Sequence, residues 1–213
     1  MSEEQRNMEE KEVLSVGSYE ENCTVFAAAG GVWIADPGSQ GAEVADAAAR
    51  MAARRGCEVR GILLTHGHFD HIGGIEAIQR RWPQLPVYVS DQDVKMLAHP
   101  MNQFPPDYPL APRPANLASP VGAVPLSFLK VLETPGHTPG SVCYLVGDTL
   151  IAGDTLFAGS IGRTDLPGGS MVAMRRSLSL LASLPPETKV IPGHGPETTL
   201  ARELATNPYL QTL

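Results

Sequence analysis

The stretch Thr65-His66-Gly67-His68-Phe69-Asp70-His71 places four potential metal ligands within six positions. Imidazole nitrogens and carboxylate oxygens are ligands for zinc, iron and manganese. The stretch directly follows the apolar run 61–64, which is expected to be a buried strand, and precedes Gly73-Gly74. A loop at a strand end allows the four side chains to turn toward one centre. A lone histidine here would be an ordinary polar loop residue, but four ligand-type residues so close together predict a metal site.

Three further potential ligands follow predicted strands, and a glycine immediately precedes each of them. His137 comes after the predicted strand 126–132, Asp154 after 149–152, and His194 after 189–191. Glycine adopts backbone angles that other residues resist, so the chain can come close to a buried centre. Each of the three could by itself be an ordinary turn residue. Together they indicate one site to which several strand ends contribute.

Apolar runs and turn residues predict strands and helices in alternation along the chain. Predicted strands cover residues 24–29, 32–35, 59–64, 87–89, 126–132, 142–146, 149–152 and 189–191. Predicted helices cover residues 42–55, 74–82, 90–97, 171–184 and 198–205. Residues 99–125 contain eight prolines, which excludes a regular helix or a central strand there. Mixed sheets covered by helices are the expected architecture.

Composition and charge narrow the class of protein. The chain has 213 residues, of which 43% are hydrophobic and 18% charged, as in soluble globular proteins. Its formal net charge of −7, with no cluster of Lys and Arg, argues against a nucleic-acid partner. No apolar run is long enough to span a membrane, and the start of the chain does not resemble a signal peptide. We therefore expect a cytoplasmic protein with a flexible tail over residues 1–12 and a single domain over 13–213; its oligomeric state is left open.

The cysteines do not indicate a structural framework. Cys23, Cys57 and Cys143 are odd in number, far apart and without a Cys-x-x-Cys pair. This pattern excludes a disulfide scaffold and a zinc knuckle. Each cysteine is expected to be a small buried residue.

The motif His-x-His-x-Asp-His, followed in order by the Gly-His, Gly-Asp and Gly-His elements, resembles the metallo-β-lactamase superfamily. The resemblance extends over nearly the whole chain from Val13. It implies an α/β (α+β) fold of four layers, an αββα sandwich with a metal site at one edge. It also implies the ligands of two metal ions: His66, His68 and His137 for the first, Asp70, His71 and His194 for the second, and Asp154 between both. Asp36, in Ala35-Asp36-Pro37-Gly38, matches the first motif of the superfamily, where it would orient the ligands; a simple turn residue is the alternative.

Within the superfamily, residues 153–157, 159–169 and 192–196 are similar to glyoxalase II and its shorter bacterial relatives. The resemblance implies two divalent metal ions, zinc first and iron or manganese as alternatives. It implies hydrolysis of a small-molecule thioester such as S-lactoylglutathione by a hydroxide held between the metals, with Asp70 and Asp154 as the carboxylates of the catalytic centre. The chain ends soon after His194, where full-length glyoxalase II continues into a helical glutathione-binding domain, so the thiol carrier stays open. Arg163 is the one candidate for a substrate-side cation, and an ion pair with Asp165 is an equal alternative.

Other functions stay open on the same fold. Persulfide dioxygenases, which use a single iron, resemble the pattern too, including the Gly-Arg-Thr-Asp stretch 162–165. A lactonase or β-lactamase would use the same attack on a carbonyl, and a metal-binding protein without catalysis is a further alternative. The proline-rich segment 99–125 could cover the substrate with Phe104 and Tyr108, although an irregular surface loop is favoured. His99 lies outside every motif and is expected to be a loop residue.

Overall fold

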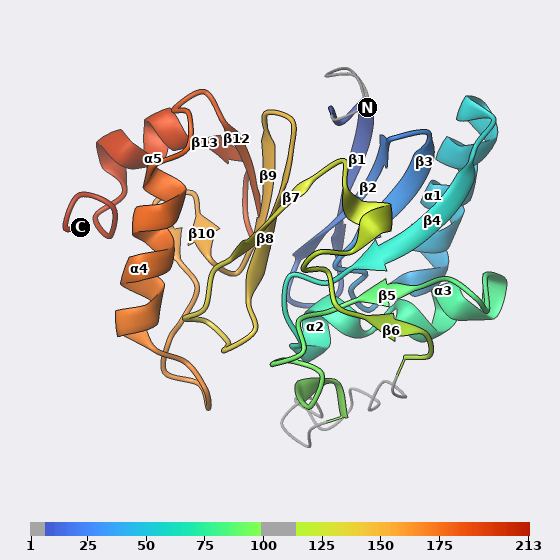
Figure 1. Ribbon diagram of the computed structural model, residues 1–213, viewed down its shortest axis with the longest axis horizontal. Coiled ribbons are helices and arrows are strands. Elements are labelled where there is room, and N and C mark those ends of the chain that lie inside the picture. Colours follow the sequence, from blue (N-terminus) through green and yellow to red (C-terminus); the bar gives the residue numbers. More distant parts are fainter. Residues whose placement is uncertain (1–6, 99–113) are drawn as a thin grey trace.

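The computed structural model describes residues 7–98 and 114–213, and in these ranges the chain forms four layers (Figure 1). Two β-sheets face each other, with helices on the outer face of each. One outer layer holds α1 (Gly41–Arg55) and α3 (Ile75–Arg81), and the other holds α4 (Met171–Ala182) and α5 (Leu200–Thr206). The observed fold is therefore the expected αββα sandwich.

The first sheet has six strands in the order of the sequence. They are β1 (Glu10–Val16), β2 (Glu21–Ala28), β3 (Gly31–Ala35), β4 (Glu58–Leu63), β5 (Val87–Tyr88) and β6 (Leu117–Ala118). The first three strands pair antiparallel, and β3 to β6 pair parallel. The short strand β6 lies within the proline-rich segment but at the sheet edge, where a neighbouring proline removes no internal hydrogen bond.

Residues 10–12 correct the expected boundary of the N-terminal tail. Glu10 pairs with Ala27 and Glu12 with Val25, so these residues form the start of β1 rather than part of a flexible tail. The sequence did not predict this strand because its charged residues interrupt the alternation of apolar and polar residues that is typical of a strand. Arg54 and Arg55 of α1 form ion pairs with Glu9 and Glu10, which places these charges at the surface beside the helix.

The second sheet has five strands in the order β13-β12-β9-β8-β7. They are β7 (Lys130–Glu133), β8 (Val142–Val146), β9 (Thr149–Gly153), β12 (Lys189–Pro192) and β13 (Thr198–Thr199). Only β9 and β12 pair parallel. A small hairpin of β10 (Leu156–Phe157) and β11 (Ser160–Ile161) follows β9.

Apolar side chains on alternate positions of the central strands hold the layers together, since successive side chains of a strand point to opposite faces. In β3, Ile34 packs in the cluster beneath α1, and Trp33 packs between the two sheets. The ring centroid of Trp33 lies 5.0 Å from that of Phe128, which precedes β7. In β9, Leu150 packs toward α4 and Ile151 packs between the sheets. Both faces of these strands are buried, which explains their continuous apolar runs.

Three predicted elements differ from the structure. Residues 90–97 form successive turns ending in a 3-10 helix over Met96–Ala98, not an α-helix, because Asp93 points into the protein instead of lying on an exposed helix face. The predicted strand 126–132 begins only at Lys130, since Val124–Leu126 is a 3-10 turn. The segment Phe69–Ile72, expected to be loop, forms the one-turn helix α2.

Two expectations fall outside the described residues. The possible cover by Phe104 and Tyr108, and the loop position of His99, lie in the range 99–113. Among the helices that the structure describes, none is long and apolar enough to cross a membrane.

Candidate metal centre

All seven predicted ligands lie in one cluster where strands of both sheets end. His66 and His68 lie in the loop after β4, and α2, at one end of the sheets in Figure 1, contributes two more ligands. The second sheet contributes a residue after β7, one after β9 and one after β12. The contributed residues are Asp70 and His71 from α2, and His137, Asp154 and His194 from the second sheet.

The first trio consists of His66, His68 and His137, which are all buried. Each offers one ring nitrogen, and these atoms lie within 4.8 Å of one another. His68 Nδ1 and His137 Nε2 are 2.8 Å apart. Three imidazoles facing one point are a familiar ligand set for a catalytic zinc ion.

The second trio consists of Asp70, His71 and His194, whose ligand atoms also lie within 4.8 Å of one another. Asp70 Oδ2 is 3.3 Å from His194 Nε2 and 4.0 Å from His71 Nε2. A carboxylate with two imidazoles can hold a divalent transition-metal ion.

Asp154 lies between the two trios. Its Oδ2 is 3.4 Å from His137 Nε2 in the first trio. Its Oδ1 is 3.4 Å from His71 Nε2 and 3.7 Å from His194 Nε2 in the second. Each oxygen of this one carboxylate therefore faces a different set of ligands, which is the arrangement that a ligand shared by two metals requires.

Hydrogen bonds determine which ring nitrogen of three histidines faces the centre. Backbone carbonyls can only accept, so His137 Nδ1 donates to the carbonyl of Arg163 at 2.7 Å and His194 Nδ1 donates to that of Tyr19 at 2.9 Å. The Thr65 hydroxyl donates to an Asp36 carboxylate oxygen at 2.6 Å and therefore accepts from His66 Nδ1 at 3.0 Å. In all three rings Nδ1 carries the proton and Nε2 faces the centre, which is how a partner on the outer nitrogen orients a metal-binding histidine.

Buried polar atoms without partners support the fit of metal ions. Nε2 of His66, Nε2 of His71 and Oδ1 of Asp154 are buried and make no hydrogen bond. Leaving such atoms unpaired is costly, so most buried polar atoms have partners. These atoms point into the cluster, and a metal ion would satisfy them together.

Burial and neighbouring charges shift the protonation of the residues in the cluster. Burial lowers the pKa of His66 well below its ordinary value, and burial together with His137 lowers the pKa of His68 to about 4. Burial opposes ionisation of Asp154, but His71 and His137 outweigh it and lower its pKa. Burial opposes protonation of His71 and His194, but Asp70 and Asp154 outweigh it and raise the pKa of both rings. Because neutral imidazoles and ionised carboxylates are the forms that bind metals, these two histidines must release a proton when a metal ion binds.

Asp36 contacts two parts of the cluster. Its carboxylate accepts hydrogen bonds from the backbone N–H and the hydroxyl of Thr65, and its Oδ2 is 3.1 Å from His71 Nδ1. It is buried and has a φ of 47°. These contacts fit the predicted orienting role better than a simple turn residue.

Two of the glycines that precede ligands allow a close approach, as predicted. A Cβ at Gly153 would lie 2.2 Å from Thr65 Oγ1, and a Cβ at Gly193 would lie 2.1 Å from Asp154 Oδ1. Any side chain at these positions would push on the cluster.

The side chain of Arg163 forms an ion pair. Its guanidinium donates to both carboxylate oxygens of Asp165, at 2.7 and 2.8 Å, and both side chains are exposed. Its carbonyl, by contrast, accepts the hydrogen bond from His137. Binding of substrate by the Arg163 side chain stays a prediction.

Two buried acids beside the cluster were not predicted. Glu21 lies with an oxygen 3.7 Å from His71 Nδ1, and Asp93 bonds to the loops around His66–His68 and His137. Both residues belong to short polar runs, 20–22 and 90–93, which are typical of exposed turns. Only the tertiary structure shows that these two side chains point inward.

Comparison with known proteins places this site in a family. The model of the metallo-beta-lactamase superfamily matches residues 17–194, which include all seven predicted ligands. The chain belongs to the metallo-β-lactamase superfamily. It is a metallo-hydrolase of that superfamily, and its His/Asp cluster suits divalent metal ions.

Relatives of this superfamily member extend over most of its length. A probable metallo-hydrolase of Bacillus subtilis is 35% identical, over 92% of this chain and 95% of the relative. A hydroxyacylglutathione hydrolase of Xanthomonas axonopodis pv. citri is 34% identical, over 89% of this chain and 66% of the relative. The solved structure of TTHA1623 in a di-iron-bound form has a TM-score of 0.81 and 36% identity, over 93% of this chain and 100% of that one. The BLEG-1 B3 metallo-beta-lactamase has the same TM-score and 32% identity, over 94% of this chain and 99% of that one.

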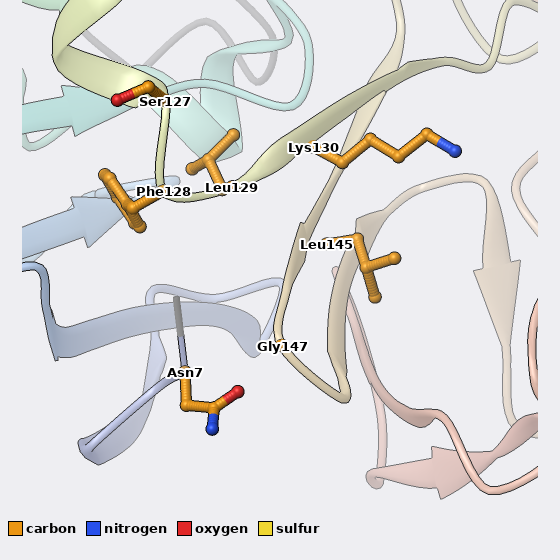
Figure 2. A pocket seen from close by; sticks show the side chains of 7 residues that line it. All are labelled: Asn7, Ser127, Phe128, Leu129, Lys130, Leu145 and Gly147. Atoms are coloured by element: carbon orange, nitrogen blue, oxygen red, sulfur yellow. The ribbon is translucent and has the colours of Figure 1, made fainter. Parts of the chain in front are cut away.

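A cavity of about 400 Å³ lies apart from the metal centre (Figure 2). Lys130 and Leu145, from the neighbouring strands β7 and β8, line it together with Asn7. The other lining residues are Ser127, Phe128, Leu129 and Gly147. Lys130 is the one charged residue among the seven, and none of the ligands lines this cavity, so it does not contribute to the chemistry of the metallo-β-lactamase site.

Proposed function

We propose that this metallo-hydrolase cleaves thioesters of small molecules at a two-metal centre, with hydroxyacyl thioesters such as S-lactoylglutathione as the substrate class. The observation that carries the proposal is Asp154, whose two oxygens face separate trios at 3.4 Å each. A site for one ion has no need of a carboxylate shared between two sets of ligands.

The chemistry of the cluster suits hydrolysis at neutral pH. Bound divalent ions would lower the pKa of water from about 15.7 to about 7 and polarise a carbonyl. Zinc is the proposed ion because imidazole and carboxylate are its usual ligands at catalytic sites; iron and manganese accept the same groups. The chain itself supplies the imidazoles of five histidines and the carboxylates of Asp70 and Asp154 at the centre.

Aromatic side chains beside the ligands support a small-molecule substrate. The ring of Tyr19, 41% exposed, lies 5.3 Å from that of Phe69, and the ring of Phe157 lies 6.0 Å from that of His194. Apolar surface with a few polar groups is typical of small-molecule sites. The net charge of −7, without a cluster of Lys and Arg, disfavours anionic partners, so we propose neither a nucleic acid nor a membrane as a partner.

The identity of the thiol that carries the acyl group is the more specific part of the proposal. The similarity to a hydroxyacylglutathione hydrolase supports glutathione, but this chain spans 66% of that relative's length. The chemistry at the metals acts on the acyl carbonyl, so other thiols can serve as the leaving group.

A substrate panel assayed with metal analysis on the same sample tests the proposal. The panel contains S-lactoylglutathione, the same acyl group on another thiol, a lactone and a β-lactam. We expect two metal ions per chain and the fastest turnover on a thioester, with activity lost in His68→Ala. His99→Ala is the matched control, since His99 lies outside every motif, and it should keep its activity.

Several outcomes would contradict the proposal. Equal thioesterase activity in the wild type and His68→Ala would show that the cluster does not catalyse the reaction. One iron per chain with oxygen consumption on glutathione persulfide would favour the oxidoreductase. Faster turnover of the lactone or the β-lactam would show that thioesters are not the preferred substrate class.

A further inference from the structure

Asp93 is a buried carboxylate that lies outside all the metal-binding motifs. It follows β5 and has no exposed surface. Its Oδ2 accepts hydrogen bonds from the backbone N–H of Gly67 at 3.0 Å and the hydroxyl of Thr138 at 2.7 Å. Its Oδ1 accepts the backbone N–H of Gly140 at 2.8 Å. Three donors on one carboxylate are enough to hold it in a single orientation.

These donors belong to the two loops that carry the first trio. Gly67 stands between His66 and His68, and Thr138 follows His137. The two loops come from different sheets, and Asp93 bonds to both of them.

In both loops a glycine lets the backbone come close to Asp93. A Cβ at Gly140 would lie 2.5 Å from Asp93 Oδ1, and a Cβ at Gly67 would lie 3.1 Å from the Asp93 carbonyl oxygen. The Thr138 hydroxyl is also held by Ser141 Oγ at 2.7 Å, which aligns it toward the carboxylate. The close approach of glycine backbone to Asp93 is therefore a feature of both loops.

The second trio has a separate support at the start of β2 and in the turn before it. The backbone N–H of Asn22 donates to the carbonyl of Gly193, and its side-chain amide donates to the carbonyls of Pro192 and Gly195. The carbonyl of Tyr19 accepts from His194 Nδ1. These contacts hold the loop of His194 without using Asp93.

We propose that Asp93 is the positioning residue of the first metal site: by joining its two loops, it sets the affinity of the His66–His68–His137 trio and leaves the second trio unchanged. The inference rests on the proposed two-metal centre. Hydrogen-bond partners outside the ligand set commonly change metal affinity by about 10- to 100-fold. Asp93 acts through backbone and hydroxyl donors rather than on a ligand ring.

Zinc titration against a competing chelator, in backgrounds with one site each, tests the inference. His194→Ala weakens the second site and leaves the first, whereas His137→Ala does the reverse. We expect Asp93→Asn to lower zinc affinity about 10- to 100-fold in the His194→Ala background and less than about 2-fold in the His137→Ala background. Asparagine keeps the size of the side chain, but its amide nitrogen cannot accept a hydrogen bond. At least one of the bonds to the two loops is therefore lost.

A second pair of variants separates positioning from folding. Thr138→Val removes the hydroxyl that bonds to Asp93, and Thr138→Ser retains it. We expect the valine variant to weaken zinc binding at the first site and the serine variant to retain it. A cooperative urea transition in the metal-free forms of both shows that they are folded, although the lost hydrogen bond lowers the midpoint of the valine variant. This pair decides the question if Asp93→Asn does not fold.

The results that overturn the inference differ from those that overturn the function. Equal losses in both backgrounds, or no loss in the His194→Ala background, would exclude a positioning role for Asp93. Failure of the wild type to bind a second zinc ion would instead contradict the two-metal centre, and the effect of Asp93 on the first site could still be measured.

Discussion

Asp154 and the residues in contact with it show how single side chains build the centre. The sequence predicted the seven residues that the structure brings together, because four ligand-type residues are crowded into 66–71 and three more follow glycines at the ends of predicted strands. It did not predict Asp93 or Glu21, because a polar residue in a polar run has the same local pattern whether it points to solvent or inward. Burial of these acids depends on loops from distant parts of the chain.

Asp154→Asn tests the shared carboxylate. The substitution keeps the size of the side chain but removes the charge that faces both trios. We expect metal content to fall from two ions to about one per chain and thioesterase activity to fall by at least about 100-fold, beyond what loss of an outer hydrogen-bond partner costs. Metal analysis and a thioester assay on the same sample measure both effects.

Asp148→Asn is the matched control for Asp154→Asn. Asp148 pairs with Lys189 at the surface, and we expect its substitution to leave metal content and activity unchanged. Two retained ions with activity near that of the wild type in Asp154→Asn would contradict the bridging role.

Gly193→Ala tests the close approach of backbone to the ligands. The added Cβ would lie 2.1 Å from Asp154 Oδ1 and 2.9 Å from His71 Cε1, so the ligands must move. We expect weaker zinc binding and a loss of about 1–3 kcal/mol in the free energy of unfolding. Gly159→Ala is the control: its Cβ would meet open space, and strain at its φ of 74° should lower stability without changing zinc affinity. Unchanged zinc binding in Gly193→Ala would show that the ligands tolerate the contact.

At the scale of secondary-structure elements, the sequence predicted correctly the helices and strands whose ends carry a capping or turn residue. The predicted helix 42–55 matches α1, since Gly56 ends it in the left-handed conformation. The helix expected over 90–97 failed because the inward contacts of Asp93 outweigh local propensity. The hairpin β10–β11 could not be predicted because Glu203 of α5, far along the chain, accepts the backbone N–H of Gly159 at 2.7 Å.

Glu203→Gln tests how α5 holds this hairpin. The buried carboxylate also accepts from Thr198 Oγ1 at 2.6 Å and from Asn207 Nδ2 at 2.9 Å. Burial raises the pKa of Glu203, but the hydrogen bonds from Thr198, Gly159 and Asn207 outweigh it, and the pKa lies below the usual 4.5. The ionised form is therefore favoured by folding. Its contribution is present above the usual pKa and is lost as the pH falls through the lower pKa of the folded state.

We expect Glu203→Gln to unfold with about 1–3 kcal/mol less free energy than the wild type at pH 7, and the difference to shrink below the usual pKa of glutamate. Urea unfolding at a series of pH values measures it. Glu187→Gln, at an exposed position, is the control and should unfold like the wild type at each pH. A difference that stays constant down to pH 3 would contradict ionisation as the cause.

For the whole molecule, the metal centre connects the two sheets. Four ligands come from the first sheet and α2, and three come from the ends of strands in the second sheet. The sandwich itself followed from the family resemblance, whereas the order of strands depends on pairings between distant segments that local pattern does not show.

Removal of metal should therefore lower the stability of the whole fold. Ligand at about 100 times its Kd stabilises a protein by about 2.7 kcal/mol, and each kcal/mol shifts the Tm of a chain of this size by about 2–4 °C. We expect a chelator to lower the Tm by about 5–10 °C, measured by calorimetry before and after zinc is restored. Asp154→Asn should show a smaller shift. Complete loss of metal with an unchanged Tm would mean that the sheets hold together without it.

The packing of Trp33 against Phe128 gives the protein an internal optical reporter. Trp33 is 4% exposed between the sheets, whereas Trp82, the other tryptophan, is half-buried, with the Arg81 guanidinium 5.1 Å from its ring centroid. Fluorescence from Trp33 is emitted in a dry environment and shifts to longer wavelength only when water enters between the sheets. Emission spectra can thus distinguish loosening of the strand ends, which leaves Trp33 dry, from separation of the two halves of the sandwich.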